Sequence, residues 1–537
     1  MPTISWESYR GAWLVRGVSR VSRVVTTPVV IGGSLALIYA MTLTANYFWD
    51  GITFASCIEK VAMGKAGGDR LFHQNHLLYN AVGFVLYRGA SAAGLSMRAL
   101  TVLQLANVVF GAFAIALFFQ IAERMTRNGY AAALSSIALG LSAVWWKLST
   151  DANAYILAVL LILLCLKNLL GPTPRWYLAG LALAGAMLIH ELSSLFCLAA
   201  MLAIFSSKTI PRKLRFVCGT GGLAWSVVIV VYYACAATLH GMTGPLEVVR
   251  WAISNPSRSA PSLNPIHGIL AAPRRNIDAI IGHDFALFRS RPGMFSSVVA
   301  SATIILALAI AFNAARTIDL SRLAHSVRSR GPLREQKKAS ATVVIAWIVT
   351  YTIFLLFWEP EDPYYPLFYM PALALLFGLV LSNYDLNTAN SNGTSSASLT
   401  PSGICALAVV ILAAFNLIFF IVPNMQQDSN QMITAAKAAR EVWNERTVIY
   451  FANHNEADTT FEYFNNRTVW RRISKTSLAE IENQIESASG EGGSVWLNRG
   501  ASELIDPEWL ARYACRRIIR VDVPGAPAHY VELSLDQ

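Results

Sequence analysis

Apolar runs of about 20 residues recur along most of the chain. They begin near Thr27 and stop at Pro423, and each is long enough to cross about 30 Å of hydrocarbon as a helix rising about 1.5 Å per residue. Beyond Pro423 short alternating segments replace them. The pattern predicts an α-helical polytopic membrane protein with a small α/β extracytoplasmic C-terminal domain.

The apolar runs divide the chain into three parts. We expect residues 1–23 to be a cytoplasmic lead, residues 24–422 the transmembrane domain, and residues 423–537 the domain outside the membrane. Two outer loops, 46–96 and 239–292, separate groups of spans. About eleven transmembrane helices result, with the N-terminus inside.

The predicted spans have uneven lengths, and two segments depart from a simple crossing. Residues 76–87 are apolar but too short to cross, which predicts a helix in the membrane interface. Residues 176–205 contain His190 and Glu191, which predicts a hairpin of two short spans with these residues near its outer tip. The remaining spans are expected at 24–44, 97–121, 130–146, 152–170, 216–236, 294–314, 341–357, 365–381 and 404–422.

The C-terminal part has the pattern of a small mixed domain. Predicted helices lie at 435–443, 478–487 and 502–513, and predicted strands at 447–452, 494–497, 518–523 and 529–533. This part carries neither a glycine-rich phosphate loop nor paired metal-ligand spacing, so we expect it to serve packing or acceptor recognition.

The composition and charge agree with a membrane protein. Hydrophobic residues make up 55% of the chain and charged residues 14%, with a formal net charge of +11. The basic residues cluster before the first span, near 124–127, at 208–215 and at 316–338, and the intervening spans put these clusters on one side. The excess charge therefore records topology and affinity for anionic membrane lipids, and no nucleic acid is implied. Most of the seven cysteines lie in apolar segments, which predicts free thiols.

The first outer loop is long, aromatic and rich in ionisable groups, as expected for a functional site. Asp50 directly follows the first span, where a carboxylate is costly unless it faces a polar cavity or a partner. It could act as a general base that takes a proton from an acceptor hydroxyl, or it could simply be solvated at the interface. Glu59 and Asp69 follow as further acids.

Asp69, Arg70, His73 and His76 form a compact group in which the histidines, three residues apart, could share one helical face. Two functions compete: Arg70, His73 and His76 could bind a phosphate, or Asp69 and the histidines could bind a divalent metal. A metal would need a further ligand that the local sequence does not clearly supply, so we expect phosphate binding and no cofactor.

Other ionisable residues are candidates for lining a cavity. Tyr79, Asp151, His190 and Glu191 are predicted to do so, although His190 and Glu191 could equally cap the hairpin. Glu361 and Asp362 lie in a late outer turn that is expected to be solvated. Arginines of the second outer loop could bind an anion or be solvated: Arg250, Arg258, Arg274, Arg275, Arg289 and Arg291.

These features together resemble the polyprenyl-phosphate-sugar-dependent glycosyltransferases of the C superfamily, which include the protein O-mannosyltransferases and the lipid A aminoarabinose transferases. The resemblance rests on Asp50 after the first span and on three segments: HQNHLLY, AGLALAGAMLIHELSSLF and WEPEDPYYPLFYMPAL. It implies that Asp50 is the catalytic base. Many members carry two adjacent acids there, whereas Gly51 follows here, so a second acidic role would fall to Glu59 or Asp69.

The resemblance implies an inverting sugar transfer from a polyprenyl-phosphate carrier to a glycan, lipid or protein acceptor on the outer face. The expected location is a bacterial inner membrane, with the C-terminal domain periplasmic or extracellular. A transporter or flippase of a lipid-linked molecule is the main alternative, because it would also need ionisable residues along a substrate path. A membrane scaffold that presents the C-terminal domain is a third.

Overall fold

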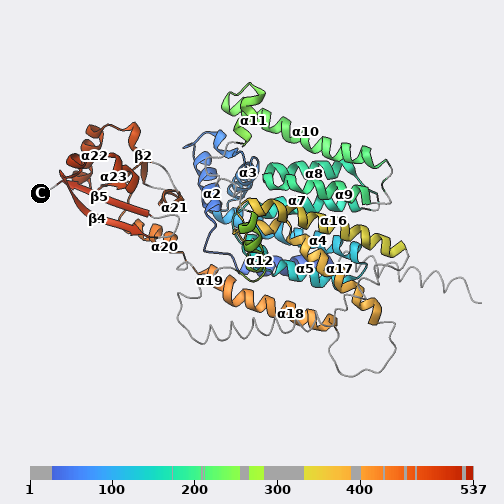
Figure 1. The fold of residues 1–537 in the computed structure, drawn as a ribbon. Helices are drawn as coiled ribbons and strands as arrows, with labels where there is room; N and C mark the ends of the chain where they lie inside the picture. Colours follow the sequence, from blue (N-terminus) through green and yellow to red (C-terminus); the bar gives the residue numbers. More distant parts are fainter. Residues whose placement is uncertain are drawn as a thin grey trace, which may run out of the picture.

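The computed structural model describes residues 27–171, 173–206, 210, 212–253, 265–282, 332–388, 401–426, 430–452, 456–465, 468–522 and 528–535. Within these ranges a bundle of roughly parallel helices carries a small sheet domain at one end (Figure 1). The apolar helices and the small sheet agree with the predicted fold class. The number of spans and the side of the membrane on which the sheet domain lies stay predictions.

Four of the described helices are long and apolar enough to cross a membrane by themselves. They are α4 (Ala99–Thr126), α10 (Lys213–His240), α16 (Pro332–Phe357) and the continuous run of α18 (Pro401–Asn416), the π-helical turn η4 (Leu417–Ile421) and α19 (Val422–Met425). Shorter apolar helices complete the bundle: Thr27–Met41, α7 (Tyr155–Leu170), α8 (Trp176–Ile189), α9 (Phe196–Ser206) and α17 (Met370–Thr388). The span predicted at 294–314 lies outside the described residues.

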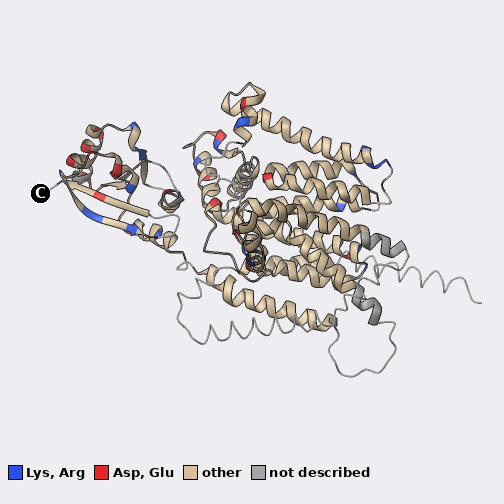
Figure 2. Ribbon diagram, viewed as in Figure 1, with Lys and Arg blue, Asp and Glu red and all other residues tan. Residues whose placement is uncertain are grey.

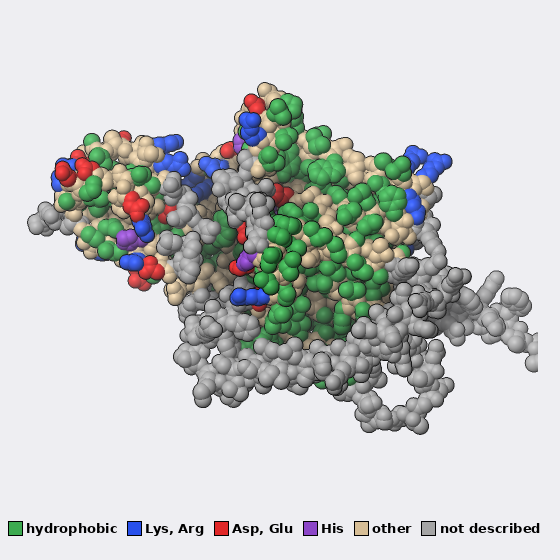
Figure 3. All heavy atoms as spheres, in the orientation of Figure 1, with side chains coloured by type: hydrophobic (Ala, Val, Ile, Leu, Met, Phe, Trp, Pro, Cys, Tyr) green, Lys and Arg blue, Asp and Glu red, His purple; other side chains and the backbone are tan. Residues whose placement is uncertain are grey.

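The face of the bundle seen in Figure 3 is largely apolar, as expected for contact with lipid. Charged side chains are sparse along the helices and gather at the two ends (Figure 2). Lysine and arginine lie at the end away from the sheet domain, where α10 begins at Lys213. Lys213 belongs to one of the basic clusters from which the topology was predicted, and the topology itself stays a prediction.

Two of the apolar segments are interrupted, one of them as predicted. The segment predicted at 130–146 consists of α5 (Gly129–Gly140) and α6 (Ala143–Ser149), which meet at a bend of 67°. The interruption predicted at His190 and Glu191 is confirmed, because α8 ends at Ile189 and a 3-10 turn, η2 (Glu191–Leu195), separates it from α9.

The first outer loop is more helical than predicted. Its expected single helix at 76–87 begins and ends later, as α3 (Tyr79–Ala92), and an unpredicted helix, α2 (Trp49–Ala62), precedes it. Between them lies the 3-10 turn η1 (Gly68–Leu71). Ile52, Ala55 and Ile58 of α2 are buried at three-residue spacing, so the amphipathic pattern of this helix was present in the sequence.

The second outer loop also contains helices that were not predicted. They are α11 (Pro245–Ile253) and α12 (Pro265–Ile281), and α12 packs against α16. The backbones approach closely at Gly268, where a Cβ would lie 2.1 Å from the carbonyl oxygen of Leu356. Helix α12 therefore belongs to the packed bundle rather than to a solvated loop.

The sheet domain has five strands in the order β2-β1-β3-β5-β4. Strand β1 (Thr447–Phe451) pairs in parallel with β2 (Val469–Arg472) and β3 (Ser494–Asn498), whereas β5 (Ala528–Leu535) is antiparallel to β3 and β4 (Tyr513–Val521). Its helical segments are α20 (Gln431–Ala438), η6 (Ala439–Glu441), α21 (Glu456–Phe464), η7 (Ile473–Lys475), α22 (Leu478–Glu491), α23 (Arg499–Leu504) and α24 (Pro507–Leu510).

The sequence predictions for this domain were largely right, with three differences. Helix α21 and strand β2 were not predicted. The helix predicted at 502–513 is wrong, because the chain forms the two short helices α23 and α24, and proline stands at the first position of α24.

The sheet domain contacts the bundle through α21. Lys60 of α2 pairs with Glu462 at 2.6 Å, and Arg98 donates to the carbonyl of Tyr463 at 3.0 Å. The Arg98 guanidinium also lies 4.1 Å from the centre of the Tyr463 ring. These contacts fix the domain against the helix that carries Asp50.

Candidate active site

A cavity of about 630 Å³ opens at the end of the bundle that faces the sheet domain. Acidic and histidine side chains gather along this edge of the apolar surface (Figure 3). The volume suits a small organic ligand. Its charged and histidine lining residues come from five regions of the chain: Asp50 on α2; Asp69, Arg70, His73 and His76 around η1; His190 and Glu191 at η2; His240 at the end of α10; and Glu359 and Asp362 before α17.

Asp50 lies in the first turn of α2, at the wall of this cavity. A carboxylate in that position is stabilised by the partial positive charge of a helix N-terminus. The rings of Phe48 and Trp49, which precede it, also line the cavity. The cavity thus surrounds the residue predicted to be the base with both aromatic and polar groups.

Gly51 explains why a second acid does not follow Asp50. A Cβ at this position would lie 2.3 Å from the carbonyl oxygen of Ala152 and 2.9 Å from its Cβ. Any side chain would therefore push α2 away from the turn before α7.

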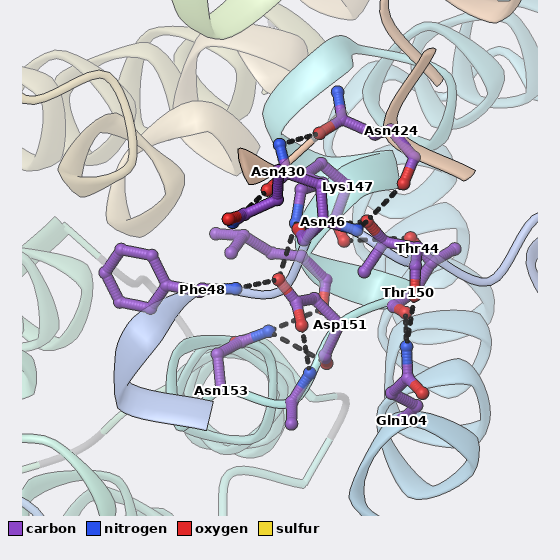
Figure 4. Close-up of polar contacts among 12 residues, drawn as sticks. Thr44, Asn46, Phe48, Gln104, Lys147, Thr150, Asp151, Asn153, Asn424 and Asn430 are labelled. Atoms are coloured by element: carbon purple, nitrogen blue, oxygen red, sulfur yellow. Dashed lines mark hydrogen bonds and ion pairs between the residues drawn. The ribbon is translucent and has the colours of Figure 1, made fainter. Parts of the chain in front are cut away.

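Asp151 was predicted to line the cavity, but it is not among the lining residues. Its fully buried carboxylate accepts from the backbone amide of Phe48 at 2.8 Å and pairs with Lys147 at 2.5 Å (Figure 4). The same lysine donates to the carbonyl of Asn46 at 2.7 Å. Asp151 is thus a positioning residue that fixes the chain leading into α2.

Neighbouring amides extend this network to the sheet domain. Asn46 donates to the side chain of Asn424 at 3.0 Å and accepts from Asn430 at 2.9 Å (Figure 4). The segment before Asp50 is therefore held both by the α6–α7 turn and by the connection between α19 and α20.

Glu59 also lies outside the cavity, although it was a candidate for the second acid. Its buried carboxylate accepts from Arg98 Nε at 2.8 and 3.0 Å, from the Ala99 amide at 2.8 Å and from the Tyr463 hydroxyl at 3.1 Å. The Glu59 carboxylate therefore joins α2 to α4 and to the sheet domain through hydrogen bonds.

Asp69, Arg70 and His73 do line the cavity, close to one another in the chain. The histidines do not share a helical face as predicted, because both precede α3 and form an isolated backbone bridge. Their rings are stacked with centres 6.2 Å apart. Arg70 is the one lysine or arginine among the described lining residues, so it is the group there that carries a permanent positive charge.

His76 lies deeper than His73, with its ring against Phe54 at 5.3 Å and His190 at 4.6 Å between centres. Burial lowers the pKa of His76 to about 3, with a smaller contribution from His73, and a hydrogen bond to the backbone of Ile189 opposes the shift. The ring is therefore neutral near pH 7. Its Nδ1 atom is buried, has no hydrogen-bond partner in the described part of the chain, and can accept a hydrogen bond.

Of the remaining residues predicted to line the cavity, two do so and one does not. His190 and Glu191 line the cavity, at the interruption between α8 and α9. Tyr79 is buried against Phe54, with ring centres 4.9 Å apart, and is not among the lining residues.

Asp362 was expected to be solvated, but it is partly buried and lines the cavity together with Glu359. Burial raises the pKa of Asp362 to about 6; the amide of Tyr364, which donates to it at 2.7 Å, lowers the pKa, and nearby Glu359 raises it. Glu361 is exposed, as predicted. The signal in the sequence was the pairing of acids with three aromatic residues in WEPEDPYYP.

Arg275 holds this acidic turn in place. Its fully buried guanidinium donates to the carbonyls of Leu355 at 2.9 Å and Pro360 at 3.2 Å. Glu359, between them, has a left-handed backbone with φ of 42°, a conformation that a surrounding structure must enforce. Arg274 and Arg250 are exposed, and Arg258, Arg289 and Arg291 lie outside the described residues.

Among known proteins, the chain is similar to solved structures but not to any family model or curated sequence. Among solved structures, ArnT from Cupriavidus metallidurans in the apo state aligns over 94% of this chain and 97% of its own, with a TM-score of 0.57 and 14% identity. The chain has an ArnT-like fold.

Two other solved structures align less closely. They are an oligosaccharyltransferase from Archaeoglobus fulgidus (TM-score 0.42, 12% identity, 88% of this chain and 69% of that chain) and the arabinofuranosyltransferase AftD from Mycobacteria (0.43, 12%, 95% and 41%). Such TM-scores do not establish a shared fold. The alignment with ArnT confirms, at the level of the fold, the resemblance that the sequence predicted.

The ArnT-like bundle brings together carboxylates, one arginine and histidines, and such groups raise the question of a metal. Among the described residues, no three histidine, cysteine, aspartate or glutamate side chains are grouped so that they could hold a metal ion. Asp69, His73 and His76, which are all described, therefore do not form such a group. The arrangement can instead supply proton acceptors and one fixed cation.

Proposed function

We propose that this chain is an inverting membrane glycosyltransferase that moves a sugar from a polyprenyl-phosphate carrier to an acceptor hydroxyl on the outer face. The observation that carries the proposal is the cavity of the ArnT-like bundle, in which Asp50 and Arg70 line the same space. A proton acceptor and a cation are the two groups that this reaction needs.

In the proposed reaction Asp50 takes the proton of the acceptor hydroxyl while the oxygen attacks C1 of the sugar. The new C1–O bond forms on the face opposite the carrier, and the bond from C1 to the phosphate oxygen breaks. The polyprenyl phosphate leaves with that electron pair. Attack from the opposite face inverts the configuration at C1, and the proton stays on Asp50 until it is lost to solvent.

Arg70 is the proposed partner of the phosphate, because its guanidinium can donate two parallel hydrogen bonds to phosphate oxygens. His73 is proposed to contact the same phosphate. A neutral His76 adds no charge, so we propose that its Nδ1 accepts a hydrogen bond from a sugar hydroxyl instead.

We propose Asp362 and Asp69 as candidates for the second acidic group beside the base Asp50. Glu59 lies outside the cavity, and its carboxylate is paired with Arg98. A carboxylate with a raised pKa is neutral for part of the physiological range and can then donate to a sugar oxygen. The reaction needs no cofactor. The expected setting is a bacterial inner membrane, with the sheet domain on the side of the lipid-linked donor.

Full-length protein in proteoliposomes tests the proposal. The vesicles receive a panel of polyprenyl-phosphate hexoses, pentoses and aminopentoses labelled in the sugar, together with lipid and oligosaccharide acceptors. We expect label in an acceptor and an equal amount of released polyprenyl phosphate. Movement of the label to the other leaflet while still attached to its carrier would support a flippase and contradict the proposal.

A further inference from the structure

A second cavity, of about 760 Å³, lies in the sheet domain, and nothing in the proposed chemistry uses it. We call it the sheet-domain cavity and define it by its lining residues: Arg440, Trp443, Asn444, Glu445, Arg446, Phe464, Asn465, Thr468, Glu491 and Gly492. They come from the segment between α20 and β1, from the end of α21 and from the end of α22.

Two buried polar atoms of this lining have no hydrogen-bond partner among the residues that the structure describes. The indole Nε1 of Trp443 is a donor and the Oδ1 of Asn465 is an acceptor, and each side chain belongs to a residue that is 4% exposed. A buried polar group without a partner is costly, so both atoms call for a ligand or ordered water.

Packing and hydrogen bonds hold both side chains in place. The Trp443 ring is packed against Phe461 at 5.5 Å and Tyr530 at 5.3 Å between ring centres. The amide nitrogen of Asn465 donates to the carbonyls of Ala436 at 2.6 Å and Phe461 at 3.0 Å, which orients its oxygen. The donor and the acceptor are therefore preorganised.

The chemistry of the lining favours a neutral ligand rich in hydroxyl groups. Two arginines and two glutamates among the lining residues balance in formal charge. A hydroxyl group both donates and accepts, so neighbouring hydroxyls of a sugar can satisfy both Trp443 and Asn465. An anion would satisfy the donor and leave the acceptor unpaired.

The position of the cavity relates it to the candidate active site. Phe464 lines the sheet-domain cavity, and its ring stacks on Tyr47 with centres 6.3 Å apart. The next residue, Phe48, lines the candidate active site. Phe464, Tyr47 and Phe48 thus form a continuous run of contacts from one cavity to the other.

We propose that the sheet-domain cavity binds a saccharide unit of the acceptor through Trp443 and Asn465. That the saccharide belongs to the acceptor rests on the proposed function. That the sheet-domain cavity binds a saccharide does not. A chain bound there could extend past Tyr47 toward Asp50.

Direct binding to the full-length protein in nanodiscs tests the proposal without donor or turnover. Glucose, mannose and arabinose trisaccharides are the probes, glycerol and inorganic phosphate are the comparison ligands, and saturation-transfer NMR is the readout. We expect at least one trisaccharide to bind, with Trp443→Phe weakening it roughly fivefold to tenfold through the lost hydrogen bond. Trp509→Phe is the matched control, because the Nε1 of Trp509 donates to Glu482 at 2.8 Å, outside the cavity.

A photoreactive form of the bound trisaccharide gives a measurement on the wild-type chain that does not depend on the variant folding. We expect cross-links in residues 440–446 or 464–465. No binding by any trisaccharide, equal binding by glycerol or phosphate, unchanged affinity in folded Trp443→Phe, or cross-links confined to other segments would overturn the proposal. Binding that persists in a chain without transferase activity would refute the proposed function alone.

Discussion

The ion pair between Lys147 and Asp151 offers a prediction that links stability to the position of Asp50. The two side chains are 3% and 0% exposed and 2.5 Å apart. Lys147→Met leaves a buried carboxylate whose remaining donors, among the described residues, are the amides of Phe48 and Ala152. Removal of one partner of a buried pair costs about 3–5 kcal/mol. We expect a loss of that size in the free energy of unfolding.

The size of the effect follows from the uncompensated charge rather than from the lost contact itself. Asp151→Asn strands the ammonium of Lys147 and should cost about as much, whereas the double variant Lys147→Met/Asp151→Asn leaves no buried charge. The double variant should therefore be markedly more stable than the sum of the single effects predicts, with a coupling energy of about 1–3 kcal/mol.

Unfolding in mixed detergent micelles, followed by tryptophan fluorescence, measures all four proteins of this cycle. Turnover on the same samples shows whether the hydrogen bond from the Phe48 amide to Asp151 matters for the reaction. We expect kcat of folded Lys147→Met to fall while the donor KM changes little. A destabilisation below about 1 kcal/mol, or strictly additive effects, would refute the assignment of a buried charged pair.

Three further predictions concern charge and topology. The donor KM should rise as pH increases through about 6, because Asp362 becomes ionised and repels the phosphate, and Asp362→Asn should abolish this dependence; an unchanged profile would separate Asp362 from the donor. Arg70→Gln should raise the donor KM about 10-fold to 100-fold with little change in kcat, while chelator leaves activity unchanged; chelator-sensitive activity restored by a divalent ion would instead support a metal. In right-side-out vesicles an impermeant maleimide should label exposed Cys515, but not a cysteine placed at Thr173 in a Cys515→Ser chain; the opposite pattern would invert the topology.

Much of the bundle could be predicted because long apolar runs leave few alternatives. Helices α4, α10 and α16 lie where their spans were expected, and the polar residues His190 and Glu191 predicted the interruption after α8. Helix α2 could not be told from a loop by its sequence, because its ionisable residues, including Asp50, are typical of both. Strand β2 was missed because this edge strand, Val469–Arg472, has no buried face to produce an alternating pattern.

The candidate site was predictable where its residues are local in sequence and unpredictable where tertiary packing decides. Asp50, Asp69 and Arg70 share one loop and line one cavity. Asp151 could not be recognised as a positioning residue, because its partner Phe48 is 103 positions away. Arg275 was expected either to bind an anion or to be solvated, and burial against the carbonyl of Pro360 gives it a third role.

The central claim is that Asp50 acts as a base on the acceptor hydroxyl, and the turnover of Asp50→Asn tests it most directly. An amide keeps the shape of the carboxylate but cannot take the proton, so the loss should fall in kcat. With purified lipid-linked donor we predict that kcat falls about 10²–10⁴-fold, with a donor KM within a few-fold of the wild type. Glu59→Gln is the matched control, and it should lower stability but keep kcat per folded molecule. Near-normal kcat in Asp50→Asn would contradict the account.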